Sequence, residues 1–138
     1  MKSLIVPATE DAIDEVQAFI NDELVRCGCS EDVQGQIEIV VEEIFVNIAS
    51  YAYHPVEGEA EIRCEVQEDP LQVTIQFLDH GHPFDPLAKE DADTSVEAIE
   101  AREGGLGILL VKKMMDDVQY SYQDGKNVLT VKKRLVTE

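Results

Sequence analysis

The 138 residues carry a formal net charge of -18 at pH 7 and are 44% hydrophobic, a length and composition that fit one domain with a substantial core. So strong a negative charge repels nucleic-acid phosphates and anionic lipids, which disfavours nucleic-acid and membrane binding and favours partners with basic or neutral surfaces. No apolar run approaches the roughly 20 residues that span a bilayer, and the start is too short for a signal peptide, so we expect a soluble, cytoplasmic protein.

The first part of the chain predicts a strand followed by two helices. Residues 3–6 suit a short strand, and Thr9 can then cap a helix whose apolar side chains recur at helical spacing until Gly28 provides a stop. Ser30, followed by two acidic residues, predicts the start of a second helix, because acids favour the positive end of the helix dipole. We expect this helix to run to about Tyr53. Its apolar stripe consists of Ile37, Val40, Val41, Ile44 and Ile48.

Two hairpins are predicted farther along the chain, because apolar and polar residues alternate on both sides of turn-forming residues. They join residues 59–67 to 71–78, and residues 118–122 to 127–135 around Asp124 and Gly125. In the first hairpin, Val73, Ile75 and Phe77 are expected to share one face of their strand.

Between the hairpins, residues 86–103 are rich in Asp and Glu and show no strong periodicity, which predicts a long mobile loop with room for a short helix. Residues 106–115 then repeat apolar side chains at helical spacing. The order of elements predicts a single α+β domain over residues 1–138. We expect a two-layer α/β sandwich, with a mixed, mostly antiparallel sheet covered on one face by helices.

The three cysteines, Cys27, Cys29 and Cys64, are odd in number and lack paired C-x-x-C spacing. Neither a disulfide framework nor a zinc site is therefore indicated, and we expect reduced thiols.

Glu43 and Asn47 are the first candidate site residues. They lie four residues apart in a predicted helix and so project from nearly the same side. The carboxylate can orient or deprotonate a nucleophile, and the amide oxygen suits Mg²⁺, which prefers oxygen ligands. A solvated helix face is the alternative explanation of this spacing.

Asp79 and Gly81 end a predicted strand. The aspartate can accept a hydrogen bond from an exocyclic amine, and the glycine lets the backbone turn or approach a flat ligand. A turn residue that satisfies nearby backbone donors is an equally good explanation of Asp79. His80 and His82 lack the spacing of a zinc site, so we expect exposed turn histidines.

Gly104, Gly105 and Gly107 immediately precede the third predicted helix. Free backbone N–H groups and the helix dipole could meet a polyphosphate there. No Gly-Lys-Ser/Thr follows, so this is not a Walker sequence. The alternative is a helix entrance that needs small residues for close packing.

Together and in this order, these three segments resemble the Bergerat-fold ATPases of the GHKL group, which includes gyrase, a heat-shock chaperone, histidine kinases and a mismatch-repair protein. Within the group the chain is most similar to the small bacterial anti-sigma factor serine/threonine kinases. Their asparagine box, D-x-G-x-P-F-D-P and G-G-L-G-x-x-L-V segments correspond to residues 43–47, 79–86 and 104–111. The resemblance covers almost the whole chain and implies a histidine kinase-like ATPase fold.

The resemblance implies a role for each matching residue. Glu43 would be the general base, and Asn47 would hold Mg²⁺ against the phosphates of ATP. Asp79 and Gly81 would recognise adenine, with Thr130 on a late strand nearby. Residues 86–103 would form an ATP lid, from which Arg102 could reach the γ-phosphate. The remaining nucleotide contacts would come from Phe84, Gly104, Gly105, Leu106 and Gly107.

The main hypothesis is therefore a Mg-ATP-dependent serine/threonine protein kinase and anti-sigma factor. It would sequester a sigma factor, phosphorylate a serine on a STAS-type anti-sigma factor antagonist, and form a homodimer. One alternative is a catalytically silent nucleotide-binding module that acts by protein interaction. Another, set apart from the resemblance, is a small α+β domain that binds a basic protein through its acidic surface.

Overall fold

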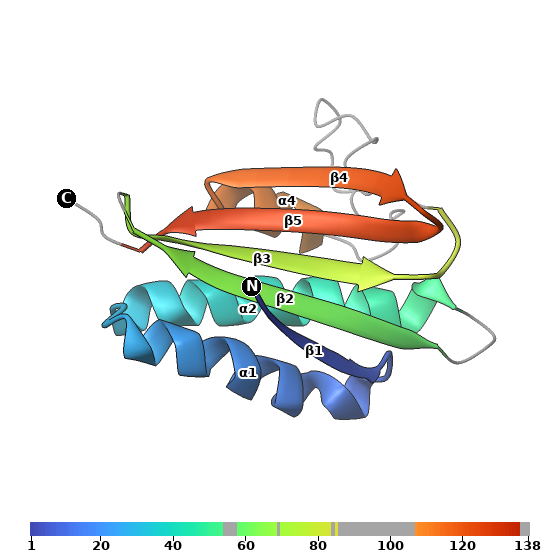
Figure 1. Cartoon of the computed structure of the whole chain (residues 1–138), viewed down its shortest axis with the longest axis horizontal. Helices are drawn as coiled ribbons and strands as arrows, with labels where there is room; N and C mark the ends of the chain where they lie inside the picture. Colours follow the sequence, from blue (N-terminus) through green and yellow to red (C-terminus); the bar gives the residue numbers. More distant parts are fainter. Residues whose placement is uncertain (54–57, 69, 84, 86–106, 136–138) are drawn as a thin grey trace.

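In the computed structural model, which describes residues 1–53, 58–68, 70–83, 85 and 107–135, the strands form one twisted sheet with the helices along one face (Figure 1). The elements are β1 (Lys2–Pro7), the 3-10 turn η1 (Glu10–Ala12), α1 (Ile13–Arg26), α2 (Glu31–Asn47), the π-helix η2 (Ile48–Ala52), β2 (Glu59–Gln67), β3 (Gln72–Asp79), α4 (Gly107–Met114), β4 (Asp117–Gln123) and β5 (Lys126–Arg134).

The five strands are ordered β1-β2-β3-β5-β4, and each neighbouring pair is antiparallel. The predicted α+β sandwich is therefore confirmed, and its mostly antiparallel sheet is antiparallel throughout the described strands. Two tight hairpins account for two of these pairings, because a short turn can join only antiparallel neighbours. The chain connects the neighbouring strands β3 and β5 through α4 and β4.

The core lies between the sheet and the helices. Val73, Ile75 and Phe77 share the inward face of β3 and are at most 1% exposed, as predicted from their alternation. The described sheet face opposite the helices is mainly polar along β2 and β3. On the helix side, the fully buried side chains include Val16, Ile20, Leu24, Ile37, Val40 and Val41.

The ends of α1 and α2 follow from local sequence. The Ser30 side chain accepts a hydrogen bond from the Val33 N–H at 3.3 Å and caps α2, as predicted. Gly28, at φ +77°, ends α1, and the N–H groups of Gly28 and Cys29 return to the carbonyls of Val25 and Leu24. This is the Schellman arrangement that favours glycine.

Two expectations about these helices need correction. Thr9 precedes a 3-10 turn rather than α1, and its side chain makes no capping hydrogen bond; its backbone carbonyl accepts from Ala12 N–H instead. The second helix does continue almost to Tyr53, but it is α-helical only to Asn47 and then widens into the π-helix η2. Short π-helical turns often occur at functional sites.

The β4–β5 hairpin turns at Asp124 and Gly125, whose φ angles are 53° and 77°. Two consecutive positive φ values define the tight turn that matches strand twist, so the predicted hairpin is confirmed. At the opposite end of β5, Lys133 Nζ donates to the Met114 carbonyl at 2.5 Å. The C-terminal end of α4 is thereby fixed at the end of the sheet far from the β4–β5 turn.

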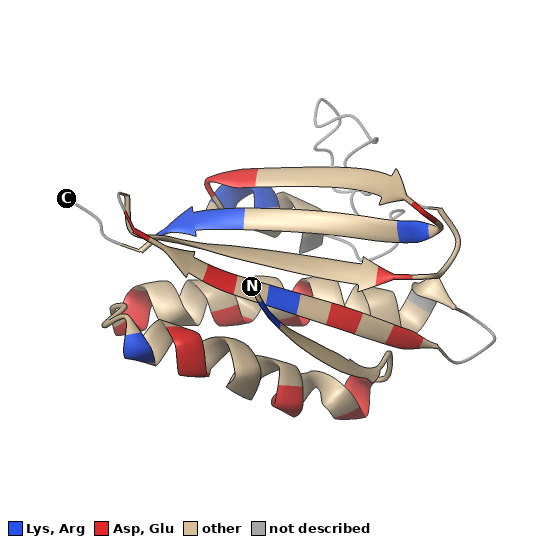
Figure 2. Cartoon of the chain, in the orientation of Figure 1, with Lys and Arg blue, Asp and Glu red and all other residues tan. Residues whose placement is uncertain are grey.

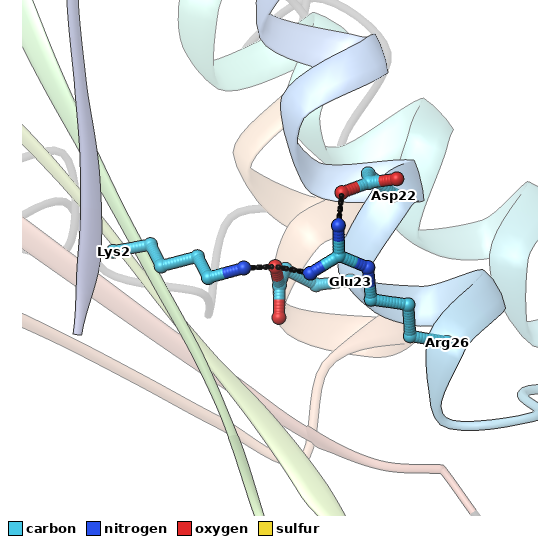
Figure 3. A network of polar contacts seen from close by, with 4 residues as sticks. All are labelled: Lys2, Asp22, Glu23 and Arg26. Carbon is cyan, nitrogen blue, oxygen red and sulfur yellow. Dashed lines mark hydrogen bonds and ion pairs between the residues drawn. The ribbon is translucent and has the colours of Figure 1, made fainter.

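Charged side chains are unevenly distributed over the described surface. Asp and Glu lie along α1, α2 and β2, whereas Lys and Arg gather on β5 and α4 (Figure 2). One small network joins β1 to α1: Glu23 contacts Lys2 at 2.6 Å and Arg26 at 3.6 Å, and Arg26 also reaches Asp22 at 3.0 Å (Figure 3). Ion pairs of this kind at the surface add little stability.

All three cysteines are free, in agreement with the expected reduced thiols. Cys29 and Cys64 are buried, and Cys27 is half-buried. Within the part of the chain that the structure describes, no helix is both long and apolar enough to cross a membrane.

Candidate functional site

Asp79, at the carboxyl end of β3, is a buried carboxylate with well-defined partners. It is 6% exposed, and its Oδ1 accepts hydrogen bonds from the Gly81 N–H and from Asn127 Nδ2, both at 2.9 Å. Among the described residues, no donor bonds to Oδ2. One oxygen is therefore held in place while the other can accept a hydrogen bond from a ligand, a role suited to an exocyclic amine.

Asn127 is a site residue that the sequence reasoning missed. It lies directly opposite Asp79 in the β3–β5 register and is 7% exposed. Its Nδ2 donates to Asp79 Oδ1 and also to the His82 carbonyl at 2.9 Å, while Tyr120 donates its hydroxyl to Asn127 Oδ1. Alternation after the Asp124-Gly125 turn places Asn127 on the face of Leu129, but only the strand register puts it beside Asp79.

The loop after β3 is held against the π-helix η2. The His82 N–H donates to the Ala52 carbonyl at 3.1 Å, and the His80 N–H donates to the Tyr53 hydroxyl at 2.7 Å. The same hydroxyl donates to the Glu59 carbonyl at 2.5 Å. Burial raises the pKa of Tyr53, and the neighbouring Asp79 charge adds to that rise, so the phenol stays protonated and able to donate.

Gly81 is required by the packing of the loop against η2. A Cβ atom built on Gly81 would lie 2.1 Å from the Ala52 carbonyl oxygen and 2.6 Å from its carbon. Both are backbone atoms of η2, which cannot turn aside as a side-chain tip can. The absence of a side chain therefore allows the Asp79 loop to touch the end of the helix that carries Asn47.

His80 and His82 are exposed, as expected for turn residues. Within the described residues, no group of three or more His, Cys, Asp or Glu side chains is arranged to hold a metal ion.

Glu43 and Asn47 lie on one side of α2, and both are half-buried. α2 packs against α1, where Gln17 Nε2 donates to the Glu38 carbonyl at 2.8 Å. It also packs against α4, so that α1 and α4 flank α2 (Figure 1).

The N-terminus of α4 lies toward the same end of the molecule as Asp79. Lys133 holds the C-terminal carbonyl of Met114, and β4 then begins at Asp117, opposite Lys132. Asp79 pairs with Asn127 at the other end of β5. The helix therefore starts, at Gly107, toward the end where β3 and α2 finish. Backbone N–H groups at such a terminus favour anions.

Thr130 is not brought to Asp79. Its side chain accepts a hydrogen bond from Gln76 Nε2 at 3.3 Å, across the β3–β5 pairing. Thr130 alternates with the core residues Leu129 and Val131, whereas Asp79 shares the inward face. Two residues on opposite faces of a sheet cannot read the same base, so the late-strand position beside Asp79 belongs to Asn127.

Several sequence-predicted residues fall outside the described part of the chain. They are Phe84, Gly104, Gly105, Leu106, Arg102 and the expected lid over residues 86–103. The described residues therefore place the Asp79 carboxylate, the Glu43 and Asn47 pair, and the start of α4.

The polar groups of this arrangement match those of an adenine nucleotide with a bound cation. Asp79 Oδ2 offers an acceptor for an amino group, Asn47 offers an amide oxygen for a cation, and the start of α4 offers N–H groups for phosphates. These groups occupy the same end of a two-layer fold and come from three separate elements.

Known proteins are similar to this chain in sequence and in fold. Residues 6–133 match the family described as the histidine kinase-like ATPase domain. The serine-protein kinase RsbW of Listeria monocytogenes serovar 1/2a is 28% identical over 135 residues, which cover 94% of this chain and 85% of that protein. The serine-protein kinase RsbW of Oceanobacillus iheyensis is 30% identical over 133 residues, covering 92% and 82%.

Two solved structures are similar at lower sequence identity. The RsbU and RsbW domains of a Mycobacterium tuberculosis protein superpose with a TM-score of 0.68 at 15% identity, covering all of this chain and 34% of that one. The Acinetobacter baumannii histidine kinase AdeS gives a TM-score of 0.55 at 19% identity, covering 99% and 70%. These two likenesses concern the fold alone.

Proposed function

Because the chain belongs to the histidine kinase-like ATPase domain family, we propose that it is a Mg-ATP-dependent serine/threonine protein kinase and anti-sigma factor. It sequesters a sigma factor and phosphorylates a serine on a STAS-type anti-sigma factor antagonist. Relatives that match most of the chain are named serine-protein kinases, which supports this assignment.

The observation that carries the proposal is the state of the Asp79 carboxylate. Its Oδ1 is occupied by two protein donors, and its Oδ2 accepts none from the described residues. A buried acceptor of this kind favours a base that places an amino group opposite Oδ2, as adenine can, over one that places a carbonyl oxygen there. Gly81 keeps the adjoining backbone close to η2.

The chemistry is assigned to α2. Glu43 accepts the proton of the acceptor serine, and Asn47 directs its amide oxygen toward the cation and the phosphates. Mg²⁺ supplies charge neutralisation on the transferring phosphoryl group when it is bound. It is usually held by one or two protein oxygens together with the phosphates, so a single amide ligand is sufficient.

The remaining nucleotide contacts follow from the family pattern. Residues Gly104 to Gly107 would surround the phosphates at the start of α4, and Phe84 would border the base. The lid over residues 86–103 would cover the nucleotide, with Arg102 near the γ-phosphate. These assignments rest on the sequence and on the position of Gly107 at the first turn of α4.

The partner surfaces are assigned by charge. The acidic side chains along α1 and α2 (Figure 2) suit a basic protein surface, in keeping with the net charge of -18. We assign the sigma factor and the antagonist to this protein as partners, together with a second copy of the chain in a homodimer. The protein would act in the cytoplasm.

Nucleotide-dependent stabilisation tests the binding part of the proposal. The melting temperature should rise with millimolar ATP or ADP in the presence of Mg²⁺, because a ligand that binds only the folded state stabilises it. Asp79→Ala should lose the shift with and without the metal, whereas Asn47→Ala should lose mainly its Mg²⁺ dependence. An unchanged melting temperature for the wild type would contradict the proposal.

Phosphoryl transfer tests the role of Glu43. Purified STAS-type antagonist proteins would be incubated with Mg-ATP, and phosphoserine would be measured by mass spectrometry. Glu43→Gln should bind ATP normally yet transfer roughly 10²- to 10⁴-fold more slowly. Glu42→Gln is the matched control, because Glu42 is exposed on another side of the same helix. ATP binding without transfer by the wild type would favour a silent nucleotide-binding interaction module.

A further inference from the structure

A chain of three buried or half-buried side chains leads from the edge strand β4 to the Asp79 carboxylate. Tyr120 donates its hydroxyl to Asn127 Oδ1, and Asn127 Nδ2 donates to Asp79 Oδ1 at 2.9 Å. The second Nδ2 hydrogen is directed to the His82 carbonyl, also at 2.9 Å. The amide therefore links strands β4, β5 and β3 at the point where the base would be read.

The donors and acceptors fix which way the Asn127 amide points. If the amide were reversed, its oxygen would face the Asp79 carboxylate and the His82 carbonyl, both of which are acceptors. Its nitrogen would then face the Tyr120 oxygen, which would have to accept instead. Only the observed orientation satisfies the carboxylate and the carbonyl together.

We propose that Asn127, oriented by Tyr120, is the positioning residue that holds the Asp79 carboxylate with Oδ2 toward the amino group of an adenine nucleotide. The inference rests on the proposed function and adds to it a residue that determines base specificity. By occupying Oδ1, Asn127 prevents the carboxylate from rotating and leaves a single oxygen to meet the base. Tyr120 acts on the carboxylate through Asn127.

Asn127→Asp gives the sharpest test, because it replaces a donor by a group that donates only when protonated. At low pH the new carboxyl group shares a proton with Asp79 and can still donate to Oδ1. At higher pH two adjacent carboxylates repel, so Asp79 turns away from its position. The titratable groups on the surrounding elements are Tyr53, Glu59, His80, His82, Tyr120 and Tyr122. The wild type carries the same groups and therefore serves as the reference for the pH dependence.

The measurement is the dissociation constant of Mg-ATP and of Mg-GTP between pH 6 and pH 8.5. Wild type and the matched control Asn21→Asp, which makes the same change on α1, should show little pH dependence and prefer ATP. Asn127→Asp should bind ATP within a few-fold of the wild type at pH 6. At pH 8.5 it should bind at least about tenfold more weakly, as expected for the loss of one hydrogen bond to a charged group.

Tyr120→Phe provides a second variant that keeps the ring in the core and removes only the hydroxyl. It should fold normally and lower the preference for ATP over GTP, because the Asn127 amide is no longer held from β4. ATP binding by Asn127→Asp that follows the wild-type pH profile, or an unchanged base preference in both variants, would overturn this inference alone. Failure of the wild type to bind ATP would overturn it together with the proposed function.

Discussion

Gly81→Ala should destabilise the protein even when no nucleotide is present. The new Cβ would lie 2.1, 2.6 and 2.8 Å from the oxygen, carbonyl carbon and Cβ of Ala52, whereas ordinary contacts begin at 3.4 Å. The oxygen and carbon belong to the backbone of η2, so the β3 loop and the π-helix must separate by about 1 Å.

The cost follows from the contacts that such a separation disrupts. The hydrogen bond from the His82 N–H to the Ala52 carbonyl is already 3.1 Å long, and that from the His80 N–H to the Tyr53 hydroxyl is 2.7 Å. Overpacking costs about 1–3 kcal/mol, and each weakened hydrogen bond adds about 0.5–1.5 kcal/mol. We expect a loss of about 2–6 kcal/mol in the free energy of unfolding, a large part of the total for a small domain.

Urea unfolding of the nucleotide-free protein measures this loss directly. Gly35→Ala is the control, because a Cβ there meets nothing within 4 Å; in the middle of α2 it should stabilise by about 0.5–1 kcal/mol. If Gly81→Ala unfolds at the same urea concentration as the wild type, the close approach to η2 does not require a glycine. A variant that is fully stable but fails to bind ATP would show that Gly81 serves the ligand alone.

Three further predictions concern stability. Ser30→Ala should lower the free energy of unfolding by about 1 kcal/mol in chemical denaturation, because the Val33 N–H loses its cap, and an unchanged value would contradict the capping role. Burial raises the pKa of the Cys64 thiol from 9.0 to about 12. The thiol therefore loses its proton at a lower pH in the unfolded state than in the folded state, and the free energy of unfolding should fall as pH rises between these two values. Melting experiments on Cys64→Ala should lack this contribution to the loss of stability at alkaline pH. Lys133→Met should cost about 1–2 kcal/mol in urea unfolding, because the Met114 carbonyl loses a charged donor, whereas equal stability would show that α4 ends without this support.

Local patterns in the sequence predict most of the fold. Alternation predicts both hairpins, Ser30 and Gly28 predict helix ends, and the apolar stripes predict the buried faces of α1 and α2. The prediction that Thr9 caps the first helix was wrong, because a 3-10 turn lies between Thr9 and α1. The π-helical end of α2 was not predicted. Helix type at a terminus depends on what the final turn packs against, and here that is the loop after β3.

The candidate site was predicted in part. Four-residue spacing placed Glu43 and Asn47 on one side of a helix, and the strand end placed Asp79 beside a glycine. Resemblance to a known family brought in Thr130, whose side chain lies on the opposite face of the sheet from Asp79. A family motif predicts the order of residues along a strand. It predicts less reliably the strand register, which decides which side chains of neighbouring strands are in contact.

By itself, the sequence determined most of the secondary structure, the inward faces of the regular elements and the residue types suited to an adenine nucleotide, because these depend on neighbours within a few positions. Tertiary structure alone decided that Asn127 meets Asp79 across 48 residues of chain and that Gly81 touches the end of α2. Strand register and helix packing arise from the burial of the whole core. A one-residue shift in register would turn Asn127 to the other face, so no local pattern specifies that contact.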